Sequence, residues 1–243
     1  MLNVPTLEKV RALKLYGMAR ALEEQSGSSD YQELTFEERL GLLIDREITD
    51  RDNRRLKSRL QKAKLRQQAC LEDIDYRHHR GLDKSLLLSL ATCQWIPDHL
   101  NVLIVGPTGI GKTFIACALG HKACFEGFKV LYFRASRLFK DLAVARGDGR
   151  YDKLINTMAK ASLLIIDDWG LSALSDQEQL DLLEILEDRH GINSTIITAQ
   201  LPIEHWHQMM SNSTIADAIL DRLVNSAYKI TLKGESMRRK KSD

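Results

Sequence analysis

The sequence predicts a three-layer α/β domain with a parallel sheet, preceded by an all-helical region. Apolar residues in about the first 80 positions recur at helical spacing, whereas from about residue 82 short apolar runs alternate with helices. A glycine-rich loop joins one of these runs to a helix. The chain has 243 residues, of which 44% are apolar and 28% charged, so it can bury a core without disulfides or metals.

The first part of the chain, residues 1–70, is expected to form a helical domain ahead of the α/β domain at residues 71–243. An apolar stripe runs from Leu7 to Leu22, and serine and glycine break the helix at residues 26–30. Thr35 and Glu38 form a capping box that starts the next helix. We expect that helix to bury five apolar side chains: Phe36, Leu40, Leu43, Ile44 and Ile48.

Basic side chains are concentrated in two segments, although the formal net charge is only +2. Residues 51–66 carry eight positive side chains and one negative, and residues 229–243 carry six and two. Within the first segment, five basic residues at steps of four or three are expected to share a helix face: Arg51, Arg55, Arg59, Lys62 and Arg66. Such clusters indicate a polyanionic partner such as double-stranded DNA, and a solvated helix face is the alternative.

The α/β part follows from four short apolar runs that are typical of strands covered on both faces. These expected strands are 101–105, 130–133, 163–166 and 195–198. The expected helices between and after them are 113–123, 136–145, 151–160, 175–189 and 215–224. Ser175 and Glu178 form a second capping box at the start of one of these helices.

The strongest motif in the sequence is a phosphate-binding loop between the strand at 101–105 and the following helix. Residues 106–113 fit the pattern G-x-x-x-x-G-K-[ST], in which backbone N–H groups and a helix N-terminus meet phosphates. Lys112 would bridge the β- and γ-phosphates, and Thr113 would ligate Mg²⁺. The residues predicted to bind ATP are Gly106, Pro107, Thr108, Gly109, Ile110, Gly111, Lys112, Thr113 and Phe114.

Two adjacent acids, Asp167 and Asp168, end the apolar strand that begins at Leu163. Neighbouring carboxylates at the end of a buried strand are costly unless a cation or water meets them. Asp167 would hold the hydration shell of Mg²⁺, and Asp168 would orient or deprotonate the attacking water. The pair, together with the phosphate loop, predicts an ATPase that uses ATP and Mg²⁺ as its cofactors.

These motifs together resemble the AAA+ ATPases, and more closely the IstB transposition helpers, which are relatives of the DnaC helicase loader. The two helices expected between the second and third strands are similar to the initiator and helicase-loader branch. The strings that carry the resemblance are 101–113, 167–171, 197–202 with Trp206-His207, 217–223 and 234–238. The resemblance covers essentially the whole chain, and Gly234-Glu235-Ser236-Met237-Arg238 is its most particular string.

The resemblance assigns three further catalytic positions. Gln200 falls at sensor 1, Arg222 at the arginine finger that serves a neighbouring subunit, and Arg238 at sensor 2. Because only residues 201–243 follow sensor 1, the resemblance implies a reduced helical lid. Most of the superfamily has glutamate where this chain has Asp168, and the shorter side chain withdraws the carboxylate by about 1.5 Å. A shift of about 1 Å can cost on the order of 10²-fold in rate, so we expect slow hydrolysis unless the backbone compensates.

Three functions are open at this point. The resemblance implies an ATP-hydrolysing, DNA-binding homo-oligomer, a ring or helical filament, that assists a cognate transposase in choosing target DNA. The alternatives are a helicase loader of the DnaC type and an architectural DNA binder in which ATP only switches assembly. The start of the chain lacks a secretory pattern, and no apolar run approaches about 18 residues. We therefore expect a cytoplasmic protein without a membrane partner, and the resemblance implies that it is bacterial.

Three smaller features of the sequence, the cysteines and two histidine-containing segments, have simple structural interpretations. The four cysteines lack C-x-x-C spacing and are expected to be free thiols. His205-Trp206-His207 suggests a packed turn rather than a metal site, since no third ligand is placed near it. The segment His78-His79-Arg80 precedes the ATPase core, where it is either a linker or a contact to adenine.

Overall fold

The computed structural model describes residues 4–237 of the chain. The chain divides into two compact units between Ser58 and Arg59. This division falls within a helix, α3 (Phe36–Ala63), and before the boundary expected near residue 70.

The first unit contains α1 (Val4–Ala12), α2 (Tyr16–Gly27), the short 3₁₀ turn η1 (Ser29–Tyr31) and most of α3. The apolar stripe expected to run through one helix is divided between α1 and α2, because Lys14 adopts a left-handed conformation with φ 60°. The capping box before α3 is confirmed: the Thr35 N–H donates to Glu38 Oε2 at 2.8 Å, and the Glu38 N–H donates to Thr35 Oγ1 at 3.3 Å.

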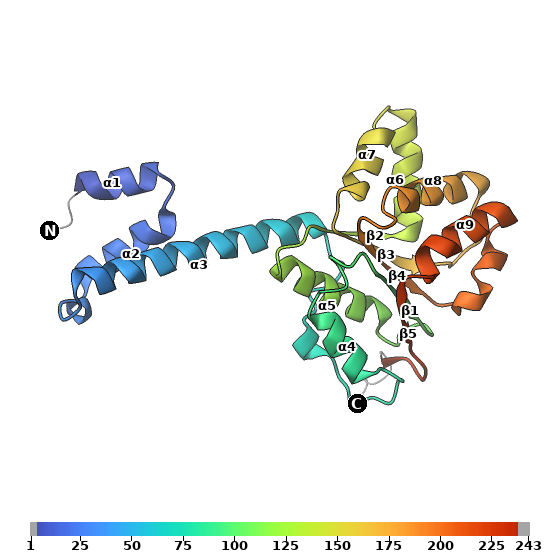
Figure 1. Ribbon diagram of the computed structural model, residues 1–243, viewed down its shortest axis with the longest axis horizontal. Coiled ribbons are helices and arrows are strands. Elements are labelled where there is room, and N and C mark those ends of the chain that lie inside the picture. Colours follow the sequence, from blue (N-terminus) through green and yellow to red (C-terminus); the bar gives the residue numbers. More distant parts are fainter. Residues whose placement is uncertain (1–3, 238–243) are drawn as a thin grey trace. The chain divides into compact units, whose positions relative to one another are not determined.

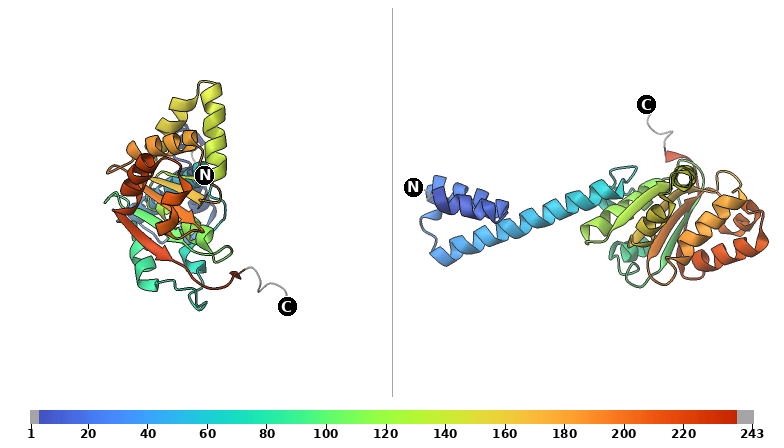
Figure 2. Two further views of the ribbon diagram at one scale, coloured as in Figure 1. Left: turned by 90° about the vertical axis from the view of Figure 1, so that its right-hand side faces the viewer. Right: turned by 90° about the horizontal axis from the view of Figure 1, so that it is seen from above.

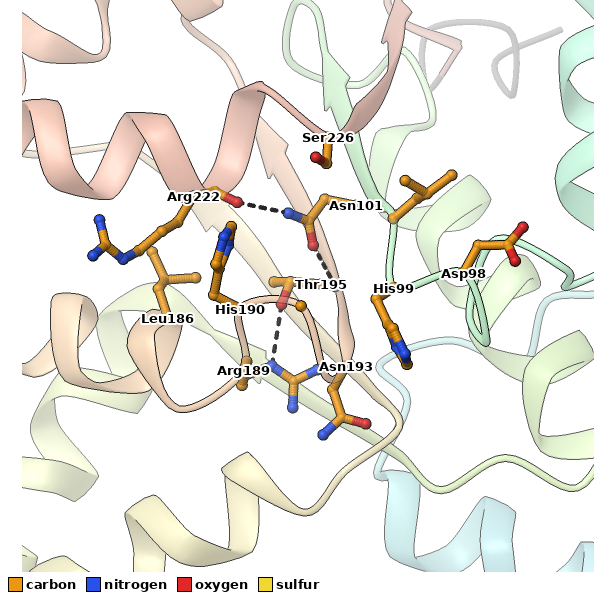
Figure 3. A pocket seen from close by; sticks show the side chains of 12 residues that line it. Asp98, His99, Asn101, Leu186, Arg189, His190, Asn193, Thr195, Arg222 and Ser226 are labelled. Carbon is orange, nitrogen blue, oxygen red and sulfur yellow. Dashed lines mark hydrogen bonds between the residues drawn. The ribbon is translucent and has the colours of Figure 1, made fainter.

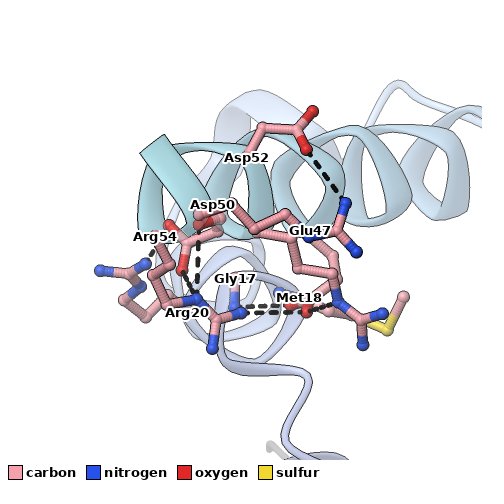
Figure 4. Close-up of polar contacts among 9 residues, drawn as sticks. Gly17, Met18, Arg20, Glu47, Asp50, Asp52 and Arg54 are labelled. Carbon is pink, nitrogen blue, oxygen red and sulfur yellow. Dashed lines mark hydrogen bonds and ion pairs between the residues drawn. The ribbon is translucent and has the colours of Figure 1, made fainter. Parts of the chain in front are cut away.

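Helices α2 and α3 meet around the buried carboxylate of Glu47 (Figure 4). Glu47 Oε2 accepts the N–H groups of Gly17 and Met18 at the start of α2, at 2.8 and 3.1 Å. Burial opposes the charge, but hydrogen bonds from Arg51 and from these two N–H groups hold the pKa of the Glu47 carboxyl below its usual value. The helices are so close that a Cβ at Gly17 would lie 2.7 Å from the Arg46 carbonyl oxygen.

The expected burial of the apolar stripe on α3 is wrong. Phe36, Leu40, Ile44 and Ile48 are all exposed, and Phe36 retains 70% of its accessible surface. The first unit offers α3 only two short helices, and their contact is centred on Glu47 rather than on this stripe. Leu43 is half-buried.

The second unit is built on a five-stranded parallel sheet in the order β2-β3-β4-β1-β5 (Figure 1). Its strands are β1 (Asn101–Val105), β2 (Val130–Arg134), β3 (Leu163–Trp169), β4 (Ser194–Ala199) and β5 (Ala227–Thr231). Its α-helices are α4 (Lys84–Ala91), α5 (Lys112–Phe125), α6 (Ala135–Gly147), α7 (Tyr151–Ala159), α8 (Asp176–Glu187) and α9 (Ser213–Val224). The 3₁₀ turns are η2 (Leu71–Asp73), η3 (Ile203–His205) and η4 (His207–Met209). The four expected strands and the capping box of α8 are confirmed, and β5 and α4 are additions.

Helices cover both faces of this sheet, as the right-hand view of Figure 2 shows. Alternate strand residues, among them Leu103, Ile166 and Ile197, pack with side chains of α6, α8 and α9 in one buried cluster. On the other face Gly120 lets α5 approach β3, since a Cβ there would lie 2.7 Å from Ile165 Cδ1. The three-layer α/β architecture predicted from the sequence is therefore confirmed.

The four cysteines are free thiols, and three of them are buried. Burial raises the pKa of the Cys93 and Cys124 thiols to about 11, which keeps both protonated at neutral pH. After β5 the structure describes residues 232–237, and it builds no α-helix from them.

Candidate active site

The phosphate loop connects the carboxyl end of β1 to the first turn of α5. Gly111 precedes the helix with φ 102°, a left-handed conformation that favours glycine. A Cβ at this position would lie 2.4 Å from Arg80 Nη1, so a larger residue would meet both strain and a clash. Residues 106–111 therefore form the tight turn that the motif requires.

Lys112 is the first residue of α5, and its side chain folds back over the loop. Its Nζ donates to the carbonyl oxygens of Gly106 and Pro107, at 2.7 and 2.9 Å. Only 6% of the residue is exposed. The ammonium group is thus fixed beside the backbone that would surround the phosphates of a nucleotide.

Asp167 is fully buried and accepts hydrogen bonds from three neighbouring elements. Thr113 Oγ1 on α5 donates to its carboxylate at 2.9 Å, and Thr198 Oγ1 on β4 donates at 2.5 Å. Tyr132 on β2 donates its hydroxyl to Oδ2 at 2.5 Å. Burial and this hydrogen bond raise the pKa of Tyr132, which keeps it a donor. The carboxylate is held rigidly beside Thr113, as the predicted magnesium site requires.

Asp168 lies where β3 departs from regular strand geometry. Its φ is +59°, and the register between β3 and β4 shifts between Ile166 and Trp169. Two guanidinium groups meet its carboxylate: Arg66 Nη1 at 3.1 Å and Arg134 Nε at 3.2 Å from Oδ2. A left-handed aspartate is uncommon and is typical of functional sites. The backbone bends at the acid whose short side chain distinguishes this chain from most of the superfamily.

A cleft of about 720 Å³ joins these groups. Besides Lys112, its lining includes five of the residues expected to bind ATP: Thr108, Gly109, Gly111, Thr113 and Phe114. Asp168 and Gln200 line it as well, so the sensor-1 candidate that follows β4 faces the same space as the two motifs. The other residues of the motif contribute backbone atoms. The carbonyl oxygens of Gly106 and Pro107 accept hydrogen bonds from Lys112, and the carbonyl oxygen of Ile110 accepts one from Arg80.

Arg66 belongs to this cleft and not to an exposed helix face with the other four basic residues. Helix α3 ends at Ala63, and Lys64 is left-handed with φ 52°, so the chain turns before Arg66. Its Nη1 lies 3.4 Å from Asp167 Oδ2 in addition to its contact with Asp168. The expectation that Arg66 continues the basic face is therefore wrong.

The other four basic residues have different surroundings. Arg51 pairs with Glu47 at 2.7 Å, and Arg55 lies 3.5 Å from Asp52 with its side chain 67% exposed. Arg59 Nε donates to the Cys124 carbonyl oxygen at 2.7 Å, and Lys62 is exposed. Arg55 and Lys62 are thus the members that present their charge most freely to solvent.

The segment around Arg80 supports the phosphate loop from outside the motif. The buried Arg80 Nη1 donates to the Ile110 carbonyl oxygen at 2.9 Å, and burial lowers the pKa of this guanidinium. Met237 N–H donates to the Gly109 carbonyl oxygen at 3.1 Å. Residues before β1 and after β5 therefore meet at the loop, and Arg238 lies just outside the described residues.

Arg222 lies beside Asn101, as Figure 3 shows, at the end of the sheet opposite to the phosphate loop. Its backbone carbonyl accepts from Asn101 Nδ2 at 3.0 Å, at the amino end of β1, whereas the phosphate loop leaves the carboxyl end. Five strand residues separate these ends by roughly 13 Å at about 3.3 Å per residue. The guanidinium pairs with Glu187 on α8 and donates to the Ala218 carbonyl oxygen at 2.8 Å. Arg222 is therefore remote from the phosphate loop of its own chain.

His205-Trp206-His207 forms a packed turn. Trp206 is fully buried and meets Trp169 edge-on, with ring centroids 6.1 Å apart. His207 Nε2 lies 3.3 Å from Asp217. Among the described residues no three histidine, cysteine, aspartate or glutamate side chains cluster as metal ligands would. No helix in residues 4–237 is long and apolar enough to cross a membrane.

The sequence did not indicate Tyr132 or Arg134 as parts of the site. Tyr132 and Arg134 lie on β2, which pairs with β3 so that Arg134 is opposite Asp167. A signal was available for Arg134, because a charged residue that ends a strand lies at the same sheet edge as the acids ending the next one. The segment of Arg80 was expected to be a linker or an adenine contact, and the structure places Arg80 against the carbonyl oxygen of Ile110 in the phosphate loop.

The fold and the phosphate loop define a P-loop α/β protein. The structure of DnaI is similar with a TM-score of 0.60 and 20% identity, covering 68% of this chain and 91% of that one. A DnaA structure bound to AMPPCP and single-stranded DNA is similar with a TM-score of 0.56 and 17% identity, covering 71% and 52%. At these identities the similarity supports the fold alone.

The sequence model of the family described as IstB-like ATP binding protein matches residues 8–243, and the chain belongs to this family. An insertion sequence ATP-binding protein of Sinorhizobium fredii, y4pL, is 54% identical over 98% of both chains. The ATP-binding protein of insertion sequence IS1162 in Pseudomonas fluorescens is 49% identical over 83% of this chain and 88% of its own. An insertion sequence protein of Mycobacterium tuberculosis is 32% identical over 96% and 93%.

Proposed function

We propose that this protein is a Mg²⁺-dependent ATPase that binds double-stranded DNA as a homo-oligomer and helps a cognate transposase to capture its target. The observation that carries the proposal is the convergence of Lys112, Thr113 and Asp168 on one cleft, with the buried Asp167 bonded to Thr113, in a chain whose relatives are ATP-binding proteins of insertion sequences. The bacterial cytoplasm, which holds DNA and ATP, is the expected location.

The chemistry follows from the positions of these side chains. Lys112 places a fixed positive charge at the phosphate loop. Thr113 and Asp167 supply neighbouring oxygens, which are the ligands that Mg²⁺ prefers. When bound, Mg²⁺ neutralises phosphate charge. Asp168 is 21% exposed at the cleft, where its carboxylate can orient a water, and Gln200 adds a polar group on the same cleft.

Removal of Arg66 is expected to strengthen Mg²⁺ binding. The Arg66 guanidinium neutralises the same carboxylates that would attract the cation, and its side chain is 38% exposed. A part-exposed pair of this kind is worth up to about 1 kcal/mol, so Arg66→Ala should lower the Mg²⁺ concentration for half-saturation about two- to fivefold. The measurement is a Mg²⁺ titration of fluorescent ATP-analogue binding. Arg137→Ala, which removes an exposed arginine on α6, is the control, and an unchanged or higher Mg²⁺ requirement in Arg66→Ala contradicts the competition.

The DNA partner is tested through phosphate contacts on α3. If about six phosphates are neutralised, affinity for duplex DNA should fall on the order of 10³-fold between 50 and 200 mM salt. The Arg55→Ala/Lys62→Ala variant should bind about tenfold more weakly and lower the salt slope by about two, equally for unrelated sequences. Arg59 is left in place because it also bonds to Cys124. Arg137→Ala/Lys140→Ala is the matched control, and equal affinities for the two variants would remove this helix from the DNA site.

The transposase role has its own test. Duplex DNA on a solid support should retain the cognate transposase when the protein and ATP are both present, and should retain much less without ATP. Retention of a replicative helicase in place of the transposase would favour the helicase-loader alternative. Retention of neither would leave an architectural DNA binder as the better description.

A further inference from the structure

A second basic surface lies on the ATPase unit, away from the phosphate loop. A cleft of about 280 Å³ is rimmed by four cations, Arg59, Lys62, Lys129 and Lys160. Its floor is apolar and includes Val130 and Leu131 of β2, which is an edge strand of the sheet. Among the described residues, no acidic side chain lines it. The sequence indicated Arg59 and Lys62 as basic residues of one helix, but not that Lys129 and Lys160 join them, because these residues come from three separate segments.

Rigid backbone holds these cations in place. Lys129 precedes β2, and its carbonyl oxygen accepts from Leu163 N–H at 3.0 Å as part of the sheet. Lys160 is the C-cap of α7, where its N–H donates to the Asn156 carbonyl oxygen at 3.2 Å. Arg59 is anchored through Cys124. The backbone is thus fixed by the fold, while the Lys129 and Lys160 side chains are exposed to solvent.

The charges of this cleft are not neutralised within the part of the chain that the structure describes. In residues 4–237, Lys62, Lys129 and Lys160 form no ion pair, whereas other basic residues of the unit do, such as Arg146 with Asp181 and Lys122 with Glu126. Several uncompensated cations over an apolar floor favour an extended polyanion.

We propose that this cleft binds the sugar–phosphate backbone of duplex DNA, so that the ATPase unit itself grips the DNA. The proposal rests on the DNA-binding role proposed above and adds to it a site on the ATPase core. The four cations on the rim are suited to contact successive phosphates of one strand, and the apolar floor is suited to pack against deoxyribose rings. A free phosphate or nucleotide would need convergent backbone N–H donors of the kind found at the phosphate loop, and the residues lining this cleft are mainly lysine, arginine and apolar side chains.

The test compares two variants that each lose two exposed lysines of this unit. Lys129→Ala/Lys160→Ala removes the rim, and Lys84→Ala/Lys140→Ala removes lysines from α4 and α6. With ATP present, the rim variant should bind unrelated duplexes about tenfold more weakly than wild type, with a salt slope lower by about two. The control variant should match wild type. ATP affinity should be unchanged in both variants, which shows that each is folded.

A second measurement uses the wild-type chain and needs no variant. Lysine acylation followed by mass spectrometry should show Lys129 and Lys160 protected by duplex DNA, while Lys84 and Lys140 react equally with and without DNA. If wild type binds DNA but the rim variant equals the control and its lysines stay reactive, this cleft is not a DNA site and the proposed function stands. If wild type fails to bind duplex DNA at all, the proposed DNA role and this surface are both overturned.

Discussion

A Lys112→Ala variant is expected to lose ATP affinity on the order of 10²-fold or more. The Lys112 ammonium is nearly buried and fixed by two loop carbonyls, so it supplies a charge that solvent does not replace. Truncating one partner of a desolvated, hydrogen-bonded charge pair costs about 2–5 kcal/mol, and each 1.4 kcal/mol is about tenfold in affinity. Titration of a fluorescent ATP analogue measures the change directly.

Lys122→Ala is the matched control, because Lys122 lies on the same helix and forms an exposed ion pair with Glu126. It should bind ATP as wild type does, and both variants should keep the wild-type thermal unfolding profile. Any assembly that depends on ATP should be lost together with affinity in Lys112→Ala. An affinity within about twofold of wild type would show that Lys112 does not contact the nucleotide.

The parts of the fold that depend on local pattern were predictable from the sequence. Continuous apolar runs such as 163–166 can be satisfied only between two helical layers, and both capping boxes form as expected. The edge strand β5 was not predicted, because of its five residues only Ile230 is buried and Lys229 is exposed. An edge strand covered on few sides needs no continuous apolar run, so it leaves little periodic signal.

The candidate active site likewise has parts that were predictable from the sequence and parts that were not. The phosphate loop and the paired acids are contiguous motifs whose spacing encodes their geometry, and the structure brings them together through Thr113 and Asp167. Arg66 reaches the acids through a tertiary contact that no spacing encodes, whereas the position of Arg134 at the end of the neighbouring strand was a signal that was not used. The prediction for Arg66 failed because a basic residue in a helical pattern was assumed to continue the helix, whereas α3 ends at Ala63. The prediction that the apolar stripe on α3 is buried also failed, because periodicity identifies an apolar helix face but does not show what covers it.

The sequence left open whether the backbone compensates for the short side chain of Asp168, and the bend of β3 at this residue bears on that question. An aspartate in place of glutamate shortens the reach of the carboxylate, and the left-handed backbone with its register shift changes the direction in which that carboxylate leaves the strand. Asp168→Asn keeps the shape and removes the charge. We expect it to bind ATP but to turn it over far more slowly than wild type, so that ATP-bound protein accumulates on DNA. Hydrolysis at the wild-type rate would show that Asp168 does not act on the water.

Arg222→Ala is expected to lower ATP turnover about 10³- to 10⁵-fold while ATP affinity changes much less, as for other residues that stabilise transferring phosphate in trans. The guanidinium lies beside Glu187 at the amino end of the sheet, remote from its own phosphate loop, so the proposed role requires that a neighbouring subunit use it. Glu187 would have to release Arg222 when subunits assemble. A single-turnover assay with radiolabelled ATP separates this loss of hydrolysis from a loss of binding.

Mixing two inactive variants tests whether the site is shared. An Asp168→Asn subunit has an inactive site but an intact Arg222, and an Arg222→Ala subunit has the reverse. In a head-to-tail assembly mixed at equal amounts, about a quarter of the interfaces pair an intact Asp168 with an intact Arg222. Activity should therefore return to roughly that fraction of wild type if interfaces act independently, and mixing two preparations of the same variant is the control. Co-purification through a tag on one variant establishes that mixed oligomers form. If they form and every mixing ratio stays as inactive as the separate variants, Arg222 does not complete a neighbour's site.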